Sequence, residues 1–300
     1  MKSTIYILII SITFFSCNTK KKEYYSNGVL KNSFTVIKGK IEGKYERYYE
    51  SGNLNVEYNF YNSKKVDSSI YYRDTKHKNI DKIIYYLNDT LQYKFYNNLQ
   101  ELVLEGKGIN DKDRIGKWKY YKKDYDSIVE YKYVNIKNTP ITYINQIWTI
   151  SKKGDTIPYK SNYFSFYKGG KDTIKTGEIL KINMMLVEPK FSYDSDIEVI
   201  LPLNAKELKD DFSNFYEIKL DTFKSLKNDG ISNIGIPKNV PINQIVEFGI
   251  QYEILGKKRI RGILVEYYKE TAKRRIERRL FFDKTITVVE NDVSNQKKKE

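Results

Sequence analysis

The chain of 300 residues is poor in the residue types on which disulfide frameworks and many catalytic sites depend. It has one Cys (Cys17), one His (His77) and six Pro. A single Cys cannot form a disulfide within the chain or supply a cysteine-rich zinc site. His77 is the only candidate base for a histidine-dependent triad, and its polar neighbours indicate a surface loop. The composition excludes a disulfide framework and argues against a histidine-dependent catalytic triad.

Ordinary hydrophobic residues are also scarce, whereas tyrosine is abundant. The hydrophobic class makes up 40% of the chain, and 28 of its members are Tyr. Leaving out the 28 Tyr and adding the 16 Gly gives 120 − 28 + 16, or 108 of 300 residues. This share is below the roughly 45–50% of a typical globular chain. Any core therefore depends on tyrosine rings, which suit half-buried pleated surfaces and favour a β protein.

The net charge of +15 comes mainly from lysine. The chain has 53 Lys and Arg against 38 Asp and Glu, and only nine of the 53 are Arg. Lysine spread in this way is typical of a solvated surface. No recognisable nucleic-acid-binding module accompanies it, so we expect no nucleic-acid partner.

The N-terminus has the pattern of an export signal. Residues 5–15 are apolar except for Ser11 and Thr13. Eleven residues are too few to cross a bilayer, which takes about 20, but they suit the apolar region of a signal peptide. The segment ends in Ser16-Cys17 and resembles the lipobox of bacterial lipoproteins, with Phe14 in place of the usual Leu. The resemblance implies a signal peptide over residues 1–16, cleavage after Ser16 and lipidation of Cys17.

We expect the mature chain to be anchored in the cell envelope through this lipid. Residues 17–23 are interpreted as a tether, with Lys20, Lys21 and Lys22 next to the membrane. Each lysine near an anionic leaflet contributes about 1 kcal/mol to membrane attraction. Because no acidic residue directly follows Cys17, we favour the periplasmic face of the outer membrane.

A tyrosine marker recurs in the first half of the chain. It stands at Tyr25, Tyr49, Tyr72, Tyr96 and Tyr121, with spacings of 24, 23, 24 and 25 residues. The first two copies read YYSNGVL and YYESGNL, and their glycines are Gly28 and Gly52. A glycine after Asn or Ser between alternating apolar residues is a hairpin signal, because the turn needs a positive φ.

A second motif precedes the tyrosine marker in two copies. It reads Gly43-Lys44-Tyr45 in one and Gly116-Lys117-Trp118 in the other. We interpret each copy as a strand, a glycine-assisted turn and a second strand, and count Gly43 and Gly116 among the turn glycines. One hairpin cannot bury its own aromatic face, so the copies are expected to stack into an elongated sheet.

Together these motifs resemble the variant MORN repeats of bacterial lipoproteins and of proteins described as toxin–antitoxin antitoxins. The resemblance covers residues 24–137. It implies an array of β-hairpins that binds or scaffolds and holds no catalytic site. The antitoxin description implies a cytoplasmic partner, which the export signal opposes.

The repeat marker disappears after residue 137, and we place a domain boundary at Thr139-Pro140. Residues 138–290 contain short apolar runs separated by turns, a pattern typical of a β-sandwich. The runs are 143–150, 164–167, 179–186, 197–201, 216–220, 242–255, 260–268 and 279–289. The last two, around Arg261-Gly262 and Phe281-Phe282, resemble the end of the Ig-like second domain of some Bacteroidetes-type lipoproteins.

Three segments of the second half are less regular. Residues 206–215 are compatible with a short helix or a loop. Residues 270–279 are compatible with a helix, but their β-rich flanks favour a hairpin with one basic strand. Residues 291–300 are polar and charged, and we expect a disordered tail.

No metal or cofactor site is predicted. The segment Asn110–Asp113 lacks the Gly and the final Glu of a calcium loop and is interpreted as a turn. The aspartates of 194–196 and of 210–211 are interpreted as solvated. A candidate aromatic binding face comprises Trp118, Tyr120, Tyr121 and Trp148. Packing within the sheet is the favoured alternative for these four rings.

The sequence therefore predicts an all-β, lipid-anchored envelope protein. We expect a non-catalytic binding or scaffolding module for another envelope protein or an anionic surface. Three alternatives stay open. They are a surface lipoprotein that binds glycans through its aromatic residues, an antitoxin-like or immunity protein, and a hydrolase whose two carboxylates meet only in the folded chain.

Overall fold

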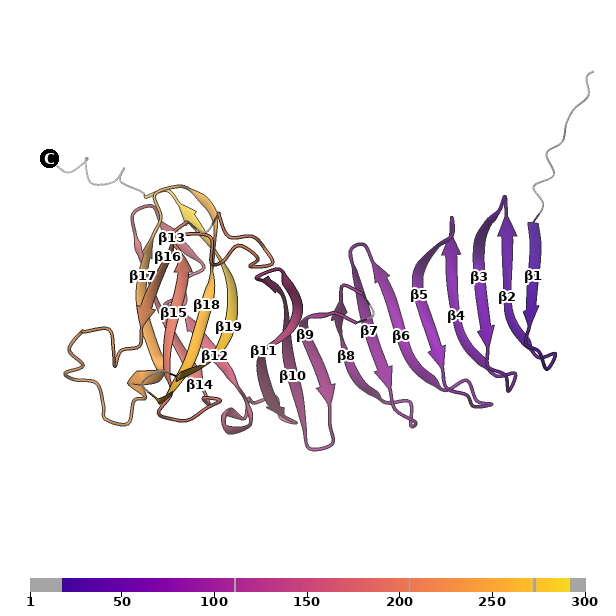
Figure 1. Ribbon diagram of the computed structural model, residues 1–300, viewed down its shortest axis with the longest axis horizontal. Coiled ribbons are helices and arrows are strands. Elements are labelled where there is room, and N and C mark those ends of the chain that lie inside the picture. The colour runs from indigo at the N-terminus through magenta and orange to yellow at the C-terminus, as the bar shows by residue number, and fades with distance from the viewer. Residues whose placement is uncertain (1–17, 111, 205, 272–273, 292–300) are drawn as a thin grey trace, which may run out of the picture. The chain divides into compact units, whose positions relative to one another are not determined.

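The computed structural model describes residues 18–110, 112–204, 206–271 and 274–291 (Figure 1). These residues form β-strands and two short 3-10 helices, η1 (Pro158–Lys160) and η2 (Ile242–Gln244). The all-β prediction is confirmed. Across this described part, we find no helix with the length and apolar character to span a membrane. The signal peptide, Ser16, Cys17 and residues 292–300 of the expected tail lie outside it.

The largest sheet is open and antiparallel, with eleven strands that follow one another in chain order. Its strands are β1 (Asn18–Tyr24), β2 (Leu30–Ile37), β3 (Lys40–Tyr48), β4 (Leu54–Tyr61), β5 (Lys64–Tyr72), β6 (Ile80–Leu87), β7 (Thr90–Tyr96), β8 (Leu102–Gly108), β9 (Arg114–Tyr121), β10 (Tyr125–Ile136) and β11 (Thr139–Ser151). The chain divides into two compact units, Met1–Val103 and Leu104–Glu300. The division falls within β8. The expected tether of residues 17–23 is instead mostly strand, since β1 begins at Asn18.

The hairpin repeat of the first unit is confirmed, with a period of 24 residues. Tyr25 and Tyr49 follow β1 and β3 and open the next turn, and each hydroxyl donates to a main-chain oxygen 23 residues later. These distances are 2.7 Å for Tyr25 to Tyr48 and 2.8 Å for Tyr49 to Tyr72. In the next repeat Arg73 takes this place and donates to Tyr96 at 2.5 Å. The side chain that opens each turn thus ties one repeat to the next.

The four predicted turn glycines divide into two kinds. Gly28 (φ 81°) and Gly52 (φ 86°) lie in turns, as expected. Gly43 and Gly116, which were also expected at turns, lie within β3 and β9, with φ of 71° and 64°. They stand where the strand register shifts, so that extra residues oppose one partner residue. Each marks a β-bulge, and the positive φ explains the glycine.

The bulge also explains why an aromatic residue stands two positions after the glycine. In β3 the bulge brings Tyr45 against Phe34 of β2, with ring centroids 5.2 Å apart. In β9 it brings Trp118 over Gly106 of β8. The motif of a glycine followed two positions later by an aromatic residue therefore places one ring against the neighbouring strand.

The predicted boundary at Thr139-Pro140 coincides with a hairpin turn of the large sheet. Lys137 (φ 52°) and Asn138 (φ 57°) form the two-residue connection between β10 and β11. Positive φ at both central positions is typical of the type I′ turn of a hairpin. The sheet therefore continues through β11 to Ser151.

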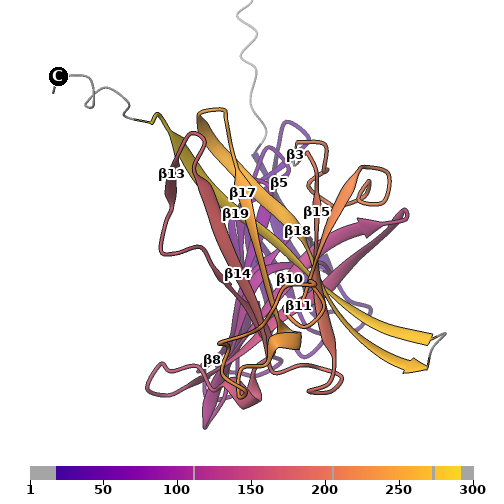
Figure 2. The same ribbon diagram turned by 90° about the vertical axis from the view of Figure 1, so that its left-hand side faces the viewer.

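The rest of the second unit is a β-sandwich. One sheet has the order β12 (Tyr163–Tyr167), β14 (Ile179–Val187), β17 (Ile245–Gln251). The other has the order β13 (Thr173–Lys175), β19 (Arg274–Val289), β18 (Gly256–Thr271), β15 (Asp196–Pro202), β16 (Leu220–Lys224). Only the pairing of β13 with β19 is parallel among the described strands. Figure 2 shows β18 and β19 side by side, and their antiparallel pairing confirms strands rather than a helix at residues 270–271 and 274–279.

The core of the sandwich forms from alternate residues of both sheets. Buried side chains of β14, such as Ile182 and Met184, meet those of β18 and β19, such as Leu264 and Leu280. The alternation of buried and more exposed residues along β14 is what a sheet with one covered face requires. Residues 206–215, left as helix or loop by the sequence, form turns in the described part. The run predicted at 216–220 begins as a strand only at Leu220.

A second, smaller core joins β10 and β11 to this sandwich within the same unit. Val134 packs with Phe212, Phe215 and Phe281. The side chain of Asn145 forms two hydrogen bonds with the main chain of Phe281, accepting at 2.7 Å and donating at 2.8 Å. The last hairpin of the large sheet and the sandwich are therefore parts of one folded body.

Candidate binding groove

A groove opens at one end of the sandwich, with a volume of about 910 Å³. We call it the sandwich groove. It lies between the end of β15, β16, the end of β17 and the start of β18. Its apolar lining includes Leu201 and Ile260 of the core, together with Phe223, Ile250 and Tyr252, which pack against that core. The groove is thus an opening between the two sheets toward the hydrophobic interior.

Four lysines stand around this apolar lining, and we call them the rim lysines. They are Lys206, Lys209, Lys257 and Lys258. None of them forms an ion pair with a described residue. The groove therefore offers positive charge that the described chain does not neutralise.

The two arginines of the groove differ from these lysines because acidic residues already hold them. Arg259 forms ion pairs with Asp210 at 2.7 Å and with Asp283. The hydrogen bond from Arg259 holds the pKa of Asp210 below its usual range. Asp210 and Asp283 thus neutralise the arginines, while the rim lysines stay unpaired.

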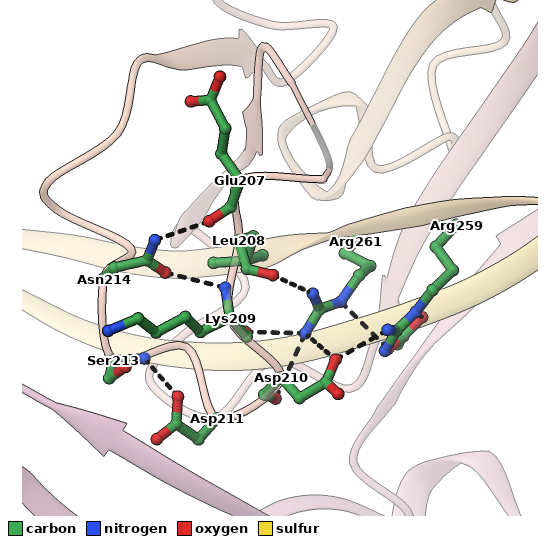
Figure 3. A network of polar contacts seen from close by, with 10 residues as sticks. Glu207, Leu208, Lys209, Asp210, Asp211, Ser213, Asn214, Arg259 and Arg261 are labelled. Carbon is green, nitrogen blue, oxygen red and sulfur yellow. Dashed lines mark hydrogen bonds and ion pairs between the residues drawn. The ribbon is translucent and has the colours of Figure 1, made fainter.

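Arg261 is buried and holds the loop that carries Lys206 and Lys209. Its guanidinium donates to the main-chain oxygens of Leu208 at 2.6 Å and Lys209 at 3.0 Å (Figure 3). It also pairs with Asp283 at 3.2 Å. Burial lowers the pKa of Arg261, with the charge of Arg259 acting in the same direction.

The same loop is braced from within by Asn214. Its side-chain oxygen accepts from the main-chain N–H of Lys209 at 2.9 Å, and its amide donates to the oxygen of Glu207 at 2.7 Å (Figure 3). Two rim lysines therefore project from a loop with a fixed backbone.

The four residues predicted as an aromatic binding face do not form one. Trp118 is only 2% exposed, and its indole N–H donates to the main-chain oxygen of Lys107 at 2.7 Å. Tyr120 lies on the same face of β9, with its hydroxyl 2.8 Å from that of Tyr131. Strand alternation puts Tyr121 on the opposite face. These rings pack within the sheet, which was the alternative that the sequence favoured.

Trp148 is half-buried and also packs locally. Its ring lies 5.7 Å from that of Tyr163, and the Lys117 ammonium stands 4.8 Å from its centroid. Because Trp148 is paired with Ile128 while Trp118 is paired with Val129, the two tryptophans lie on opposite faces of the sheet. They cannot contact one planar ligand together.

Another row of rings lies on β2, β3 and β4. Phe34 stacks on Tyr45 at 5.2 Å, and Tyr45 stacks on Tyr58 at 5.1 Å. Rings that stack across neighbouring strands turn their faces toward one another. The flat faces of this row are therefore used in packing.

The acidic segments singled out in the sequence form turns or hold neighbouring groups. Asn110 and Asp113 bond to each other at 2.8 Å across the turn between β8 and β9. His77 is exposed. Across the described residues, no cluster of three or more His, Cys, Asp or Glu side chains could hold a metal ion.

The sandwich groove was not predicted from the sequence. The available signal was the run Gly256-Lys257-Lys258-Arg259 at the start of a strand. These cations border a groove only because residues that are distant in the chain fold beside them. Those residues include Leu201, Leu203, Leu208, Asp221 and Phe223. Compared with known proteins, the chain matches no family model, no curated protein and no solved structure.

Proposed function

We propose that this protein is a non-catalytic binding module of the bacterial cell envelope, anchored through a lipid on Cys17. The observation that carries the proposal is the sandwich groove, in which an apolar lining stands beside four unpaired rim lysines. A well-formed apolar pocket with a few polar groups is the ordinary form of a binding site. The unpaired cations favour an anionic partner or surface.

The large sheet supports a scaffolding role in the same proposal. Its first strand starts at Asn18, directly after the proposed anchor, and carries Lys20, Lys21 and Lys22 in exposed positions. Lysines on an edge strand oppose the pairing of that edge with another sheet and attract an anionic leaflet. We propose the periplasmic face of the outer membrane as the location.

A cross-linked pull-down from native membranes tests this proposal. The tagged protein is compared with Lys257→Glu/Lys258→Glu, with Cys17→Ser and with Lys76→Glu/Lys123→Glu. The last variant makes the same change of charge at exposed positions outside the groove. We expect a component that the tagged protein and the control pair retain and that the groove pair loses.

The Cys17→Ser arm separates anchoring from binding. We expect this variant to leave the membrane fraction and to lose a membrane-resident partner while keeping its fold by circular dichroism. Recovery of the same components by all four proteins would contradict both the groove and the anchor. Membrane association that is unchanged in Cys17→Ser would contradict the anchor alone.

A further inference from the structure

We propose that the sandwich groove binds an anionic amphiphile, a molecule with one aliphatic chain and a carboxylate or phosphate head. This inference rests on the proposed binding function and names the chemical class of its ligand. The aliphatic chain would enter the opening between the two sheets. The head would meet the rim lysines.

The shape and position of the groove favour an aliphatic chain. Its volume of about 910 Å³ lies within the range of small-molecule sites, roughly 300–1,000 Å³. Leu201 and Ile260 line the groove and are also part of the sandwich core. A chain that enters here exchanges water for contact with apolar side chains, at about 25 cal/mol for each Å² buried.

The apolar path continues outward to the mouth of the groove. Leu203 and Ile254 both line it and are 64% and 67% exposed. Two such aliphatic side chains flank an opening that already leads to the core. Exposed apolar residues that are continuous with an apolar pocket indicate a ligand-contact surface.

The charges favour an acidic head over a neutral one. None of the rim lysines forms an ion pair with a described residue, so an incoming anion does not have to displace an internal partner from them. Asp221 and Glu253 also line the groove and would repel the head from their side. The head is therefore expected on the side of Lys257 and Lys258.

Tyr252 supplies a polar group inside this apolar lining. Its ring packs against the core, and burial raises the pKa of its hydroxyl, which stays a neutral donor. No hydrogen-bond partner for this hydroxyl occurs among the described residues. It can donate to a carboxylate or phosphate oxygen where the chain of the ligand meets its head.

Displacement of a fluorescent fatty acid from the full chain tests the inference. The chain carries Cys17→Ser so that no attached acyl group competes. Hexadecanoate and hexadecyl phosphate are the anionic competitors, hexadecanol is the neutral one, and inorganic phosphate has a head without a chain. We expect both anionic amphiphiles to displace the probe, hexadecanol to be weaker by about tenfold or more, and phosphate to have no effect.

Three variants locate the site. Lys257→Glu/Lys258→Glu should weaken the anionic competitors by about tenfold or more and leave hexadecanol unchanged. Tyr252→Phe keeps the ring and should weaken them by about two- to tenfold. The control pair Lys76→Glu/Lys123→Glu should match the parent. Circular dichroism of each variant distinguishes a lost contact from a lost fold.

Several outcomes would overturn the inference. They are no displacement by any amphiphile, equal displacement by hexadecanol and hexadecanoate, and equal loss in the groove and control pairs. Vesicles of anionic phospholipid form a further arm, and binding to vesicles without displacement by monomeric amphiphiles would assign the lysines to a membrane surface. If the pull-down still shows a groove-dependent partner, the binding function stands and only this ligand class fails.

Discussion

The hairpin sheet of residues 18–103 and the sandwich of the second unit are both all-β, yet different kinds of side-chain contact stabilise them. The buried hydrophobic residues of the first are Leu54, Val56, Tyr72, Ile84 and Tyr93. Both hydrophobic clusters of the described chain belong to the second unit. The sheet depends on contacts between neighbouring strands, whereas the sandwich depends on two faces that cover each other.

The comparison explains the unusual composition. In the hairpin sheet tyrosine rings stack across strands, as Tyr45 and Tyr58 do, and tyrosine hydroxyls bond to the next repeat, as those of Tyr25 and Tyr49 do. In the sandwich, aliphatic residues such as Ile182 and Leu264 fill the space between sheets. A chain can therefore be poor in aliphatic residues as long as one of its parts needs few of them.

The largest expected effect comes from the core of the sandwich. Phe282 is 2% exposed and contacts Phe164 and Phe166, with ring centroids 6.1 and 5.8 Å away. Phe282→Ala should lower the free energy of unfolding by about 3–5 kcal/mol through lost burial and a cavity. Tyr58→Ala in the hairpin sheet should cost about 1 kcal/mol, because it removes cross-strand contacts of a half-buried ring. Denaturant unfolding of both variants gives the comparison, and equal losses would contradict it.

The next largest loss of unfolding free energy is expected from removing one partner of a buried ion pair, also in the sandwich. Glu266 and Arg278 are 0% and 8% exposed, and Arg278 Nε lies 3.3 Å from Glu266 Oε2. The carboxylate also accepts from the main-chain N–H of Lys190 at 2.7 Å and from the Ser195 hydroxyl at 3.1 Å.

Arg278→Met should therefore cost about 3–5 kcal/mol, because it leaves a buried carboxylate without its cation. The pair Glu266→Gln/Arg278→Met should cost less than the sum of the single variants. A double-mutant cycle in denaturant measures this coupling, and simple additivity would show that the pair does not act as a unit.

Local patterns in the sequence were enough to predict the strands and the repeat. The apolar runs 179–186 and 260–268, each bounded by turns, predicted β14 and β18, because a short apolar run between turn residues is typical of a buried strand. The spacing of Tyr25 and Tyr49 predicted the repeat because one residue type has the same task in each copy.

The features that the sequence placed wrongly or did not show depend on backbone geometry or on contacts between residues that are distant in the chain. Gly43 and Gly116 need a positive φ, and a bulge satisfies that need as well as a turn does. The turn at Asn138 looks like a domain boundary because a type I′ turn and a linker use similar residues. The sandwich groove joins segments from Leu201 to Arg261, and no local pattern shows that they meet.

A smaller effect is expected from a single tie between repeats. Tyr49→Phe removes the hydroxyl that donates to the main-chain oxygen of Tyr72 at 2.8 Å and keeps the ring. The expected cost is about 0.5–1.5 kcal/mol, and in a repeat array it should be local. Hydrogen exchange should show faster opening of β3 to β6 and unchanged protection in β14 and β18. Faster exchange throughout the sandwich would mean that the two parts unfold as one.

The smallest effect is an alkaline loosening of the strands around Tyr121, which ends β9 in the second unit. Burial, with the hydrogen bond to Glu105, raises the pKa of Tyr121 to about 12. In the unfolded chain a tyrosine titrates near about pH 10. The contribution of Tyr121 to stability is therefore complete below pH 10 and is lost as the pH rises from about 10 to 12, since only the unfolded state releases the proton in this window.

Burial also raises the pKa of Tyr120, on the same strand, to about 12, and that of Tyr72 above its usual range. Tyrosinate absorbance and circular dichroism followed together should show the strands around these residues opening before the sandwich does. Tyr121→Phe should flatten the loss of stability above pH 10, because the substituted ring has no proton to release. An alkaline transition with the same midpoint in the variant and the parent would place the sensitive tyrosine elsewhere, and simultaneous loss of sandwich structure would mean that the strands around Tyr121 do not open by themselves.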